Sequence, residues 1–101
     1  MNTFHTLSVA EARQLIADSE VTLIDIRDSA SYHAGHIEGA QTLDPANIDL
    51  FLDNTDRNRP VIVYCYHGIS SRSAAQYLLE QGFTTVYSLN GGFEAWKTSA
   101  D

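Results

Sequence analysis

The stretch Pro-Val-Ile-Val-Tyr-Cys-Tyr-His-Gly-Ile-Ser-Ser, residues 60–71, decides the fold. Residues 61–64 are β-branched or aromatic without interruption, which is typical of a strand buried on both faces of a parallel sheet. Gly68 permits the tight or left-handed backbone angles of a turn, and an apolar pattern of helical spacing follows. The stretch therefore predicts a strand, a short turn that starts with Cys65, and a helix.

The same alternation of strands and helices extends over the rest of the chain. Three more segments rich in β-branched and apolar residues predict strands, at residues 21–24, 39–43 and 84–89. Alternating strands and helices imply an α/β fold with a mostly parallel central sheet. In open sheets of this kind ligands bind beyond the carboxyl ends of the strands, and Cys65 lies at such an end.

Helices are predicted between these strands from their caps and their periodicity. Ser8 and Glu11 have the spacing of a capping box, and Ala12, Leu15 and Ile16 follow on one helical face. The other helices are expected over residues 28–34 with Gly35 as the stop, from an N-cap at Asp44 through 48–52, from Ser70 or Ser71 to Gly82, and over 93–97. Residues 53–59 are polar and predict a loop.

Composition narrows the class of protein. The length of 101 residues, with 44% hydrophobic and 19% charged side chains, predicts a single globular domain over residues 1–101. The single cysteine permits no internal disulfide and no multi-cysteine metal site. A net charge of −7 at pH 7 argues against nucleic acid and against an anionic membrane as partners. Because the chain has neither a long apolar run nor a signal-peptide pattern, we expect a cytoplasmic protein that spans no membrane.

Cys65 is the candidate reactive group. Successive N–H groups in a strand-to-helix turn can form an anion-binding nest, and the helix adds the positive end of its dipole. Both effects favour a thiolate and would hold an anionic substrate beside the sulfur. The alternative is that the side chain is a small buried hydrophobe at the end of a core strand. In the first case the anion is bound by the backbone and rim of Tyr66, His67, Gly68, Ile69, Ser70 and Ser71, with Arg72 adding a cation.

Four motifs follow one another along the chain: Leu-Ile-Asp-Ile-Arg-Asp at 23–28, Tyr-His-Ala-Gly-His-Ile-Glu-Gly-Ala at 32–40, Val-Ile-Val-Tyr-Cys at 61–65 and Tyr-Ser-Leu-Asn-Gly-Gly-Phe-Glu-Ala-Trp at 87–96. In these motifs and in their order the chain resembles the rhodanese family over nearly its whole length. Two further stretches are similar to the loop and the following helix of the family's bacterial single-domain thiosulfate sulfurtransferases: Cys-Tyr-His-Gly-x-Ser-Ser at 65–71 and Ala-Ala-Gln-Tyr-Leu-Leu at 74–79. The resemblance implies a three-layer α/β fold with a mostly parallel five-stranded sheet and helices on both faces.

The resemblance also implies an activity. In the family's reaction the Cys65 thiolate attacks the outer sulfur of thiosulfate, sulfite leaves, and the cysteine becomes a persulfide. The persulfide sulfur then passes to cyanide or to a thiol acceptor such as thioredoxin, which is covalent catalysis without a metal or an organic cofactor. Backbone N–H dipoles stabilise the anions, so the chemistry requires no general base.

One position departs from many members of the family, whose loop is closed by an arginine. Ser70 occupies that position here, and Arg72 comes two residues later. A serine brings no charge, and the net charge of −7 repels a dianion at long range. We therefore expect a modest affinity for thiosulfate.

Two other functions stay open. A cysteine-dependent phosphatase that shares the rhodanese fold needs an arginine after five intervening residues, to grip phosphate with two hydrogen bonds. Ser71 stands at that spacing from Cys65, and Arg72 comes one residue late. A sulfur carrier or redox sensor would keep the cysteine but would use another sulfur donor, such as a cysteine desulfurase.

Several polar and aromatic residues are expected to support the structure. Asp25 and Arg27 end a strand on the same side as the site, and we expect them to form an ion pair or to brace the loop. His33 and His36 lack the surrounding ligands of a metal site and are expected to pack at the surface. Trp96 predicts core packing.

Overall fold

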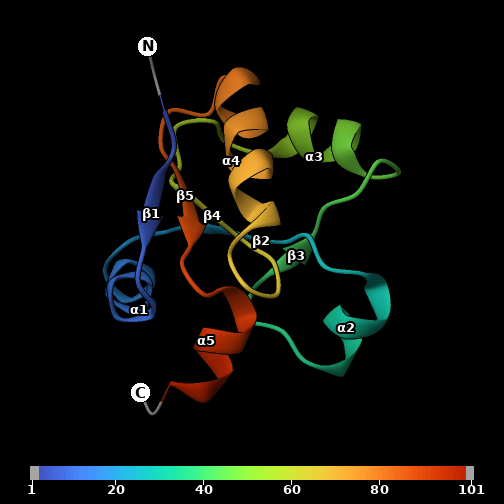
Figure 1. Cartoon of the computed structure of the whole chain (residues 1–101). Helices are drawn as coiled ribbons and strands as arrows, with labels where there is room; N and C mark the ends of the chain where they lie inside the picture. Colours follow the sequence, from blue (N-terminus) through green and yellow to red (C-terminus); the bar gives the residue numbers. More distant parts are fainter. Residues whose placement is uncertain (1–2, 100–101) are drawn as a thin grey trace.

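The computed structural model describes residues 3–99 and confirms the α/β fold. Five strands form one sheet in the order β1-β5-β4-β2-β3 (Figure 1), and all of its pairings are parallel. The strands are β1 His5–Leu7, β2 Thr22–Asp25, β3 Gln41–Thr42, β4 Val61–Tyr64 and β5 Val86–Leu89. The helices are α1 Val9–Asp18, α2 Ser29–Ala34, α3 Ile48–Asn54, α4 Ser70–Glu80 and α5 Gly92–Thr98.

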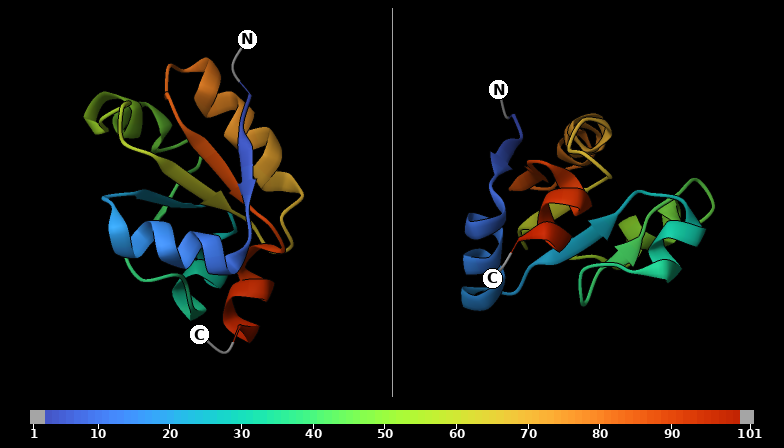
Figure 2. Two further views of the ribbon diagram at one scale, coloured as in Figure 1. Left: turned by 90° about the vertical axis from the view of Figure 1, so that its left-hand side faces the viewer. Right: turned by 60° about the horizontal axis from the view of Figure 1, so that its bottom comes forward.

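The central strand β4 is covered on both faces. Val61 and Val63 pack into one core with residues of α3 and α4, and Ile62 and Tyr64 pack into a second core with residues of α1 and α5. The helices therefore form an outer layer on each side of the sheet (Figure 2). All four side chains are buried, which explains why the sequence of this strand contains no polar interruption.

The register of the sheet brings residues that are distant in the sequence together at the carboxyl ends of the strands. Asp25 is the partner of Tyr64 across β2 and β4, and Val63 is the partner of Ser88 across β4 and β5. Because the strands are parallel, their carboxyl ends meet there. Cys65 follows β4 directly and therefore lies between the ends of its two neighbours.

Two parts of the fold differ from the expectation. No strand is predicted from the pattern of residues 5–7, yet β1 pairs there with β5; its side chains are exposed or half-buried, so it lacks the apolar signal of a central strand. The strand expected over 39–43 is reduced to the two residues of β3, at the other edge of the sheet.

The predicted start of the third helix was wrong. Asp44 accepts hydrogen bonds from the N–H groups of Ala46 at 2.8 Å and of Asn47 at 3.0 Å, so it caps an isolated turn. The helix α3 begins only at Ile48 and continues to Asn54, two residues into the predicted loop. The local signal of Asp44 followed by proline fits both a turn and a helix start, and the chain uses it for the turn.

The first helix begins as its sequence predicts. The hydroxyl of Ser8 accepts from the N–H of Glu11 at 3.1 Å, and the Glu11 carboxylate accepts from the N–H of Ser8 at 2.9 Å.

None of the helices within residues 3–99 is long and apolar enough to span a membrane.

Candidate active site

Cys65 lies in the turn between β4 and α4, and only 6% of the residue is exposed. Its sulfur is nevertheless surrounded by hydrogen-bond donors. The N–H of Gly68 donates to Sγ at 3.2 Å and the N–H of Ser71 donates at 3.4 Å. The thiol is thus buried, as the alternative interpretation expected, but it is buried in a polar turn rather than in the apolar core.

This environment favours the thiolate. Burial raises the pKa of Cys65, but hydrogen bonds from the hydroxyl and N–H of Ser71 and from the N–H groups of Gly68 and His67 outweigh burial, so the pKa lies below its usual value of 9.0. The Ser71 hydroxyl oxygen is 3.5 Å from Sγ. The thiol donates to this oxygen; once the proton is lost, the hydroxyl can donate to the sulfur instead.

The first turn of α5 orients the loop. The N–H of Phe93 donates to the carbonyl of Cys65 at 2.8 Å, and the N–H of Glu94 donates to the carbonyl of Tyr66 at 3.0 Å. A trans peptide unit points its C=O and N–H in opposite directions. Binding these two carbonyls therefore turns the N–H groups of Tyr66 and His67 away from α5, and Figure 1 shows the loop lying beside the start of this helix.

Glycine at position 92 makes this contact possible. Gly92 has φ of +58°, and a Cβ there would lie 2.5 Å from the carbonyl oxygen of Cys65 and 2.6 Å from the carbonyl carbon of Tyr66. Such distances require the loop or the helix to move. Gly68 is constrained in the same way, because its φ is +87° and a Cβ would lie 2.8 Å from the backbone nitrogen of Gly91.

We expect Gly92→Ala to slow alkylation of Cys65 by iodoacetamide about tenfold at neutral pH, because a displaced loop no longer aims its N–H groups at the sulfur. Gly39→Ala is the matched control: Gly39 also has a positive φ, of +87°, but a Cβ there meets nothing within 4 Å. Both variants lose stability from the strained φ, and only the first should lose thiol reactivity. Equal alkylation rates in the two variants would contradict the role of the α5 contact.

Asp25 and Arg27 form a buried ion pair beside the loop. Arg27 Nη2 donates to Asp25 Oδ2 at 2.7 Å and Nε donates to Oδ1 at 3.1 Å, with side-chain exposures of 4% and 0%. The same guanidinium donates to the carbonyl of Gly35 at 2.6 Å and lies 4.2 Å from the ring centre of Phe93. Burial lowers the pKa of Arg27, but the hydrogen bonds and charge of Asp25 outweigh burial and raise it. The pair joins β2, the end of α2 and the start of α5.

Tyr66 ties the loop to the start of α2. Its hydroxyl donates to the carboxylate of Asp28 and lies 2.5 Å from the hydroxyl of Ser31. Asp28 is also the N-cap of α2, since it accepts from the N–H of Ser31 at 3.1 Å. The hydrogen bond from Tyr66, followed by those from Ser31, lowers the pKa of Asp28 from 3.8 to about 2.

This lowered pKa predicts how acid affects stability. The stabilisation from the Tyr66 hydroxyl requires ionised Asp28, so it is fully present above about pH 4 and is lost as the pH falls through about 2. We expect the difference in unfolding free energy between the wild type and Tyr66→Phe, measured in urea from pH 6 to pH 2, to shrink over this range. Tyr77→Phe, at an exposed tyrosine without a hydroxyl hydrogen bond within residues 3–99, serves as control. A difference that stays constant with pH would refute the link to Asp28.

The remaining predicted loop residues lie on the rim. His67, Ser70 and Arg72 are exposed, and Ile69 is 75% exposed. The N–H of Arg72 donates to the carbonyl of Ile69 within the first turn of α4, and the Arg72 side chain makes no hydrogen bond or ion pair with residues 3–99. The structure therefore gathers the N–H groups of the loop around Cys65 but does not bring the Arg72 guanidinium into contact with it.

The histidines expected at the surface are packed there. The ring of His36 stacks on Tyr32 with 3.9 Å between centroids, and its Nδ1 lies 2.8 Å from the Tyr32 carbonyl oxygen. His33 is exposed and meets Tyr32 edge-on. Within the described part of the chain, no three His, Cys, Asp or Glu side chains are placed to hold a metal ion together.

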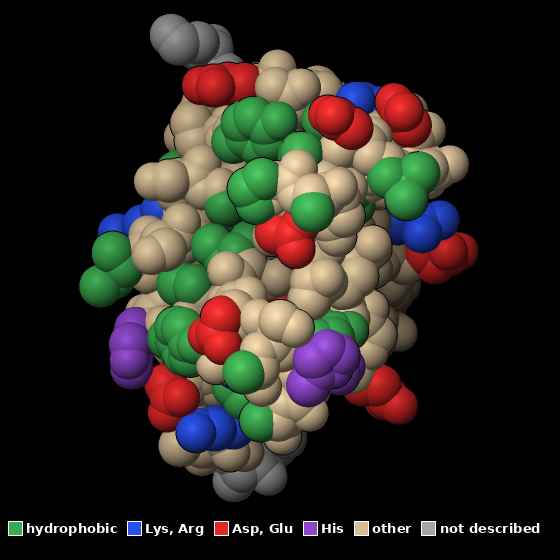
Figure 3. All heavy atoms as spheres, turned by 90° about the vertical axis from the view of Figure 1, so that its right-hand side faces the viewer, with side chains coloured by type: hydrophobic (Ala, Val, Ile, Leu, Met, Phe, Trp, Pro, Cys, Tyr) green, Lys and Arg blue, Asp and Glu red, His purple; other side chains and the backbone are tan. Residues whose placement is uncertain are grey.

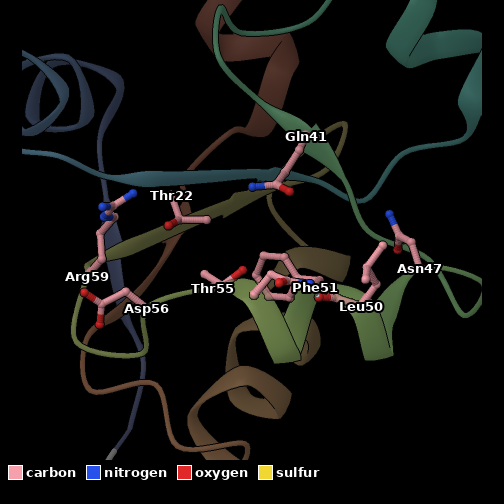
Figure 4. Close-up of a pocket in the computed structure, with 9 residues that line it drawn as sticks. Thr22, Gln41, Asn47, Leu50, Phe51, Thr55, Asp56 and Arg59 are labelled. Atoms are coloured by element: carbon pink, nitrogen blue, oxygen red, sulfur yellow. Dashed lines mark hydrogen bonds between the residues drawn. The ribbon is translucent and has the colours of Figure 1, made fainter.

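The surface of residues 3–99 has several hollows, and one of them adjoins the active-site loop. A groove of about 430 Å³ runs beside the loop and is lined by Arg27, Ser31, Ala34, Gly35, Tyr66, Phe93, Glu94 and Lys97. A cavity of about 460 Å³ lies under α3 (Figure 4), lined by residues that include Thr22, Gln41, Leu50 and Phe51. Thr22 begins β2 and Arg59, which also lines the cavity, precedes β4, so the cavity lies toward the amino ends of these strands, whereas Cys65 follows the carboxyl end of β4.

The surface charge gives an anion no general attraction. On the face drawn in Figure 3, acidic side chains are spread widely rather than gathered in one place. With a net charge of −7, any attraction for an anion at Cys65 would have to come from the loop itself.

At the carboxyl ends of the strands of a parallel sheet lies a thiol whose pKa is lowered and whose sulfur accepts hydrogen bonds from backbone N–H groups. A family model described as rhodanese-like domain matches residues 8–99, and the chain belongs to this family. It is 51% identical over 96 residues to the thiosulfate sulfurtransferase GlpE of Shewanella oneidensis, a match that covers 95% of each protein. It is 47% identical to the thiosulfate sulfurtransferase GlpE of Pseudoalteromonas translucida, over 95% of this chain and 91% of that protein. The solution structure of the rhodanese-like domain of an Anabaena protein matches with a TM-score of 0.81 at 26% identity, over 96% of this chain and 74% of that one.

Proposed function

We propose that this chain is a thiosulfate sulfurtransferase and that Cys65 carries the sulfur. The observation that supports this most directly is the thiol itself, which has a lowered pKa and accepts hydrogen bonds from the N–H groups of Gly68 and Ser71. The two relatives named as thiosulfate sulfurtransferases match nearly the whole chain. Together these observations support a nucleophilic cysteine acting on a sulfur-containing anion.

The first step forms a persulfide. The Cys65 thiolate attacks the outer sulfur of thiosulfate, so that a bond forms between Sγ and that sulfur while the sulfur–sulfur bond of thiosulfate breaks. The electron pair of that bond leaves with sulfite as a dianion, and the single negative charge of the cysteine moves to the new outer sulfur. The N–H groups of Gly68 and Ser71, which donate to Sγ, would stabilise both the donor and the persulfide.

The second step returns the thiolate. An acceptor attacks the outer sulfur, and the electron pair of the breaking bond goes back to Sγ; with cyanide the product is thiocyanate. We propose a thiol acceptor, such as thioredoxin, as the alternative to cyanide. Because the chain has one cysteine, no thiol of its own can resolve the persulfide. A thiol that must alternate between these two states suits a reducing compartment, and we propose the cytoplasm.

A phosphatase is supported less well. Ser71, at the position where that chemistry needs an arginine, is completely buried and contacts Cys65 through its N–H and its hydroxyl. Bidentate binding of phosphate needs a guanidinium aimed at the site. Among residues 3–99 the Arg72 side chain forms no hydrogen bond or ion pair that would aim it there.

Mass spectrometry of the intact protein tests the proposal. After incubation with thiosulfate we expect a gain of one sulfur atom, and we expect cyanide to remove it with formation of thiocyanate. Hydrolysis of an aryl phosphate without any sulfur adduct would overturn the proposal in favour of a phosphatase. An adduct formed only with a cysteine desulfurase as donor would make the chain a sulfur carrier. The rate of thiocyanate formation at varied thiosulfate concentration gives the Michaelis constant. A value in the low micromolar range would contradict the modest affinity for thiosulfate expected from the net charge.

A further inference from the structure

Ser88, in β5, lies behind the active-site loop and plays no part in the mechanism described so far. It is completely buried, and its Oγ lies 2.7 Å from the Oγ of Ser71, which is also completely buried. Ser71 Oγ in turn lies 3.5 Å from Sγ of Cys65. Two hydroxyls therefore connect the sulfur with the core of the protein.

The sheet register creates this contact. Ser88 is the partner of Val63, and Val63 faces the core that contains α4. Ser71 lies in the first turn of α4. Ser88 thus stands against the beginning of the helix that follows the active-site loop, although 17 residues separate the two serines in the sequence.

The direction of the hydrogen bond between the two serines decides whether the Ser71 hydroxyl presents a lone pair or a proton to the sulfur. Each hydroxyl has one proton. If Ser71 donates to Ser88, its oxygen offers Cys65 only a lone pair, which suits a protonated thiol. If Ser88 donates to Ser71, the proton of Ser71 is free to point at Sγ, which suits a thiolate. Ser88 has no other side-chain hydrogen bond within residues 3–99, so nothing else competes for its proton there.

We propose that Ser88 is a positioning residue that donates to Ser71 and so directs the Ser71 proton to Sγ whenever Cys65 is a thiolate. The proposal rests on the proposed function for its catalytic meaning. The thiolate is the nucleophile when the persulfide forms and the leaving group when the acceptor attacks the outer sulfur. A hydrogen bond to Sγ stabilises the thiolate in both situations, and a better-stabilised thiolate leaves faster.

Alkylation of Cys65 by iodoacetamide as a function of pH tests the proposal. Since the chain has one cysteine, thiol alkylation reports on Cys65 alone. We expect Ser88→Ala to move the midpoint of the alkylation rate upward by roughly half a pH unit and Ser71→Ala by roughly one. Because Ser88 acts through Ser71, the double variant should have the midpoint of Ser71→Ala alone.

The substitutions at Ser71 and Ser88 change no titratable or charged side chain. Those on the loop and on the elements packed against it are Asp25, Arg27, Tyr64, Tyr66, His67, Arg72, Tyr77, Glu80, Tyr87, Glu94 and Lys97. Ser73→Ala, at an exposed serine of α4, is the matched control and should leave the midpoint where it is. Ser88→Thr keeps the hydroxyl and should restore the wild-type midpoint, whereas a general packing defect would not be repaired by it.

The proposal is overturned if Ser88→Ala folds and keeps the wild-type midpoint, if it shifts the midpoint further in the Ser71→Ala background, or if a folded Ser88→Thr behaves like Ser88→Ala. Urea unfolding identifies the folded variants, and the substitution to alanine removes only one oxygen atom. Alkylation needs no thiosulfate. A shifted midpoint in a protein that gains no sulfur would therefore support the role of Ser88 while refuting the proposed function.

Discussion

Cys65→Ser is expected to lower the rate of thiocyanate formation from thiosulfate and cyanide by more than about 10⁴-fold. A serine hydroxyl stays protonated at neutral pH, so the loop N–H groups have no anionic nucleophile to stabilise. The sequence contains no second cysteine that could take its place. The variant should also gain no sulfur in the mass spectrum. The measurement is the initial rate of thiocyanate formation at saturating donor.

The control for Cys65→Ser is a measurement of its stability, which shows whether the variant still folds. Serine is close in size to cysteine, and its oxygen can accept from the same N–H groups of Gly68 and Ser71. We therefore expect urea unfolding of Cys65→Ser to stay near that of the wild type, and Ser73→Ala to retain wild-type turnover. Turnover of Cys65→Ser within tenfold of the wild type would show that the sulfur does not pass through this residue.

Asp25→Ala should lower the free energy of unfolding by about 3–5 kcal/mol, a large part of the stability of a small domain. The substitution leaves the Arg27 guanidinium buried without its charge partner, since the two side chains are 0% and 4% exposed. The same guanidinium holds the carbonyl of Gly35 and packs on Phe93, so the loss should spread to α2 and α5. Urea unfolding at neutral pH measures the effect.

The surface ion pair between Arg59 and Glu20 provides the matched comparison. Its atoms are 3.2 Å apart, but the side chains are 42% and 85% exposed. Glu20→Ala should therefore cost less than about 1 kcal/mol. Asp25→Asn keeps the shape of the side chain but not its charge. Its loss of unfolding free energy should lie between the losses of Asp25→Ala and Glu20→Ala. The importance of the buried pair would be refuted if Asp25→Ala and Glu20→Ala destabilised the protein equally.

Much of the fold could be predicted because its strongest signals are local. The apolar run of β4 and the capping box formed by Ser8 and Glu11 each depend on neighbouring residues, and both appear in the structure as expected. The short edge strand β1 could not be predicted, since its three residues, two exposed and one half-buried, carry no apolar periodicity. Asp44 misled the prediction because its local sequence satisfies a turn and a helix cap equally well.

The candidate site was predicted only in part, because some of its contacts are local in the sequence and others are not. The order of strand, glycine-containing turn and helix placed Cys65 beside backbone N–H groups, and Gly68 and Ser71 do donate to its sulfur. The sequence offered no signal for Ser88, which contacts the loop only through the register of β5 against β4. The hydrogen bond from Tyr66 to Asp28 spans 38 residues, so no local pattern could predict it.

By itself, the sequence determined that one thiol lies at the end of a central strand and that the chain contains no second thiol that could accept a sulfur atom from it. The tertiary structure decided what surrounds that thiol: α5 holds the carbonyls of Cys65 and Tyr66, and Ser88 reaches the loop from a neighbouring strand. The physical reason is the range of the interactions. Backbone preference and hydrophobic periodicity act between near neighbours, whereas these contacts exist only after the parallel sheet has set its register and both of its faces have been packed.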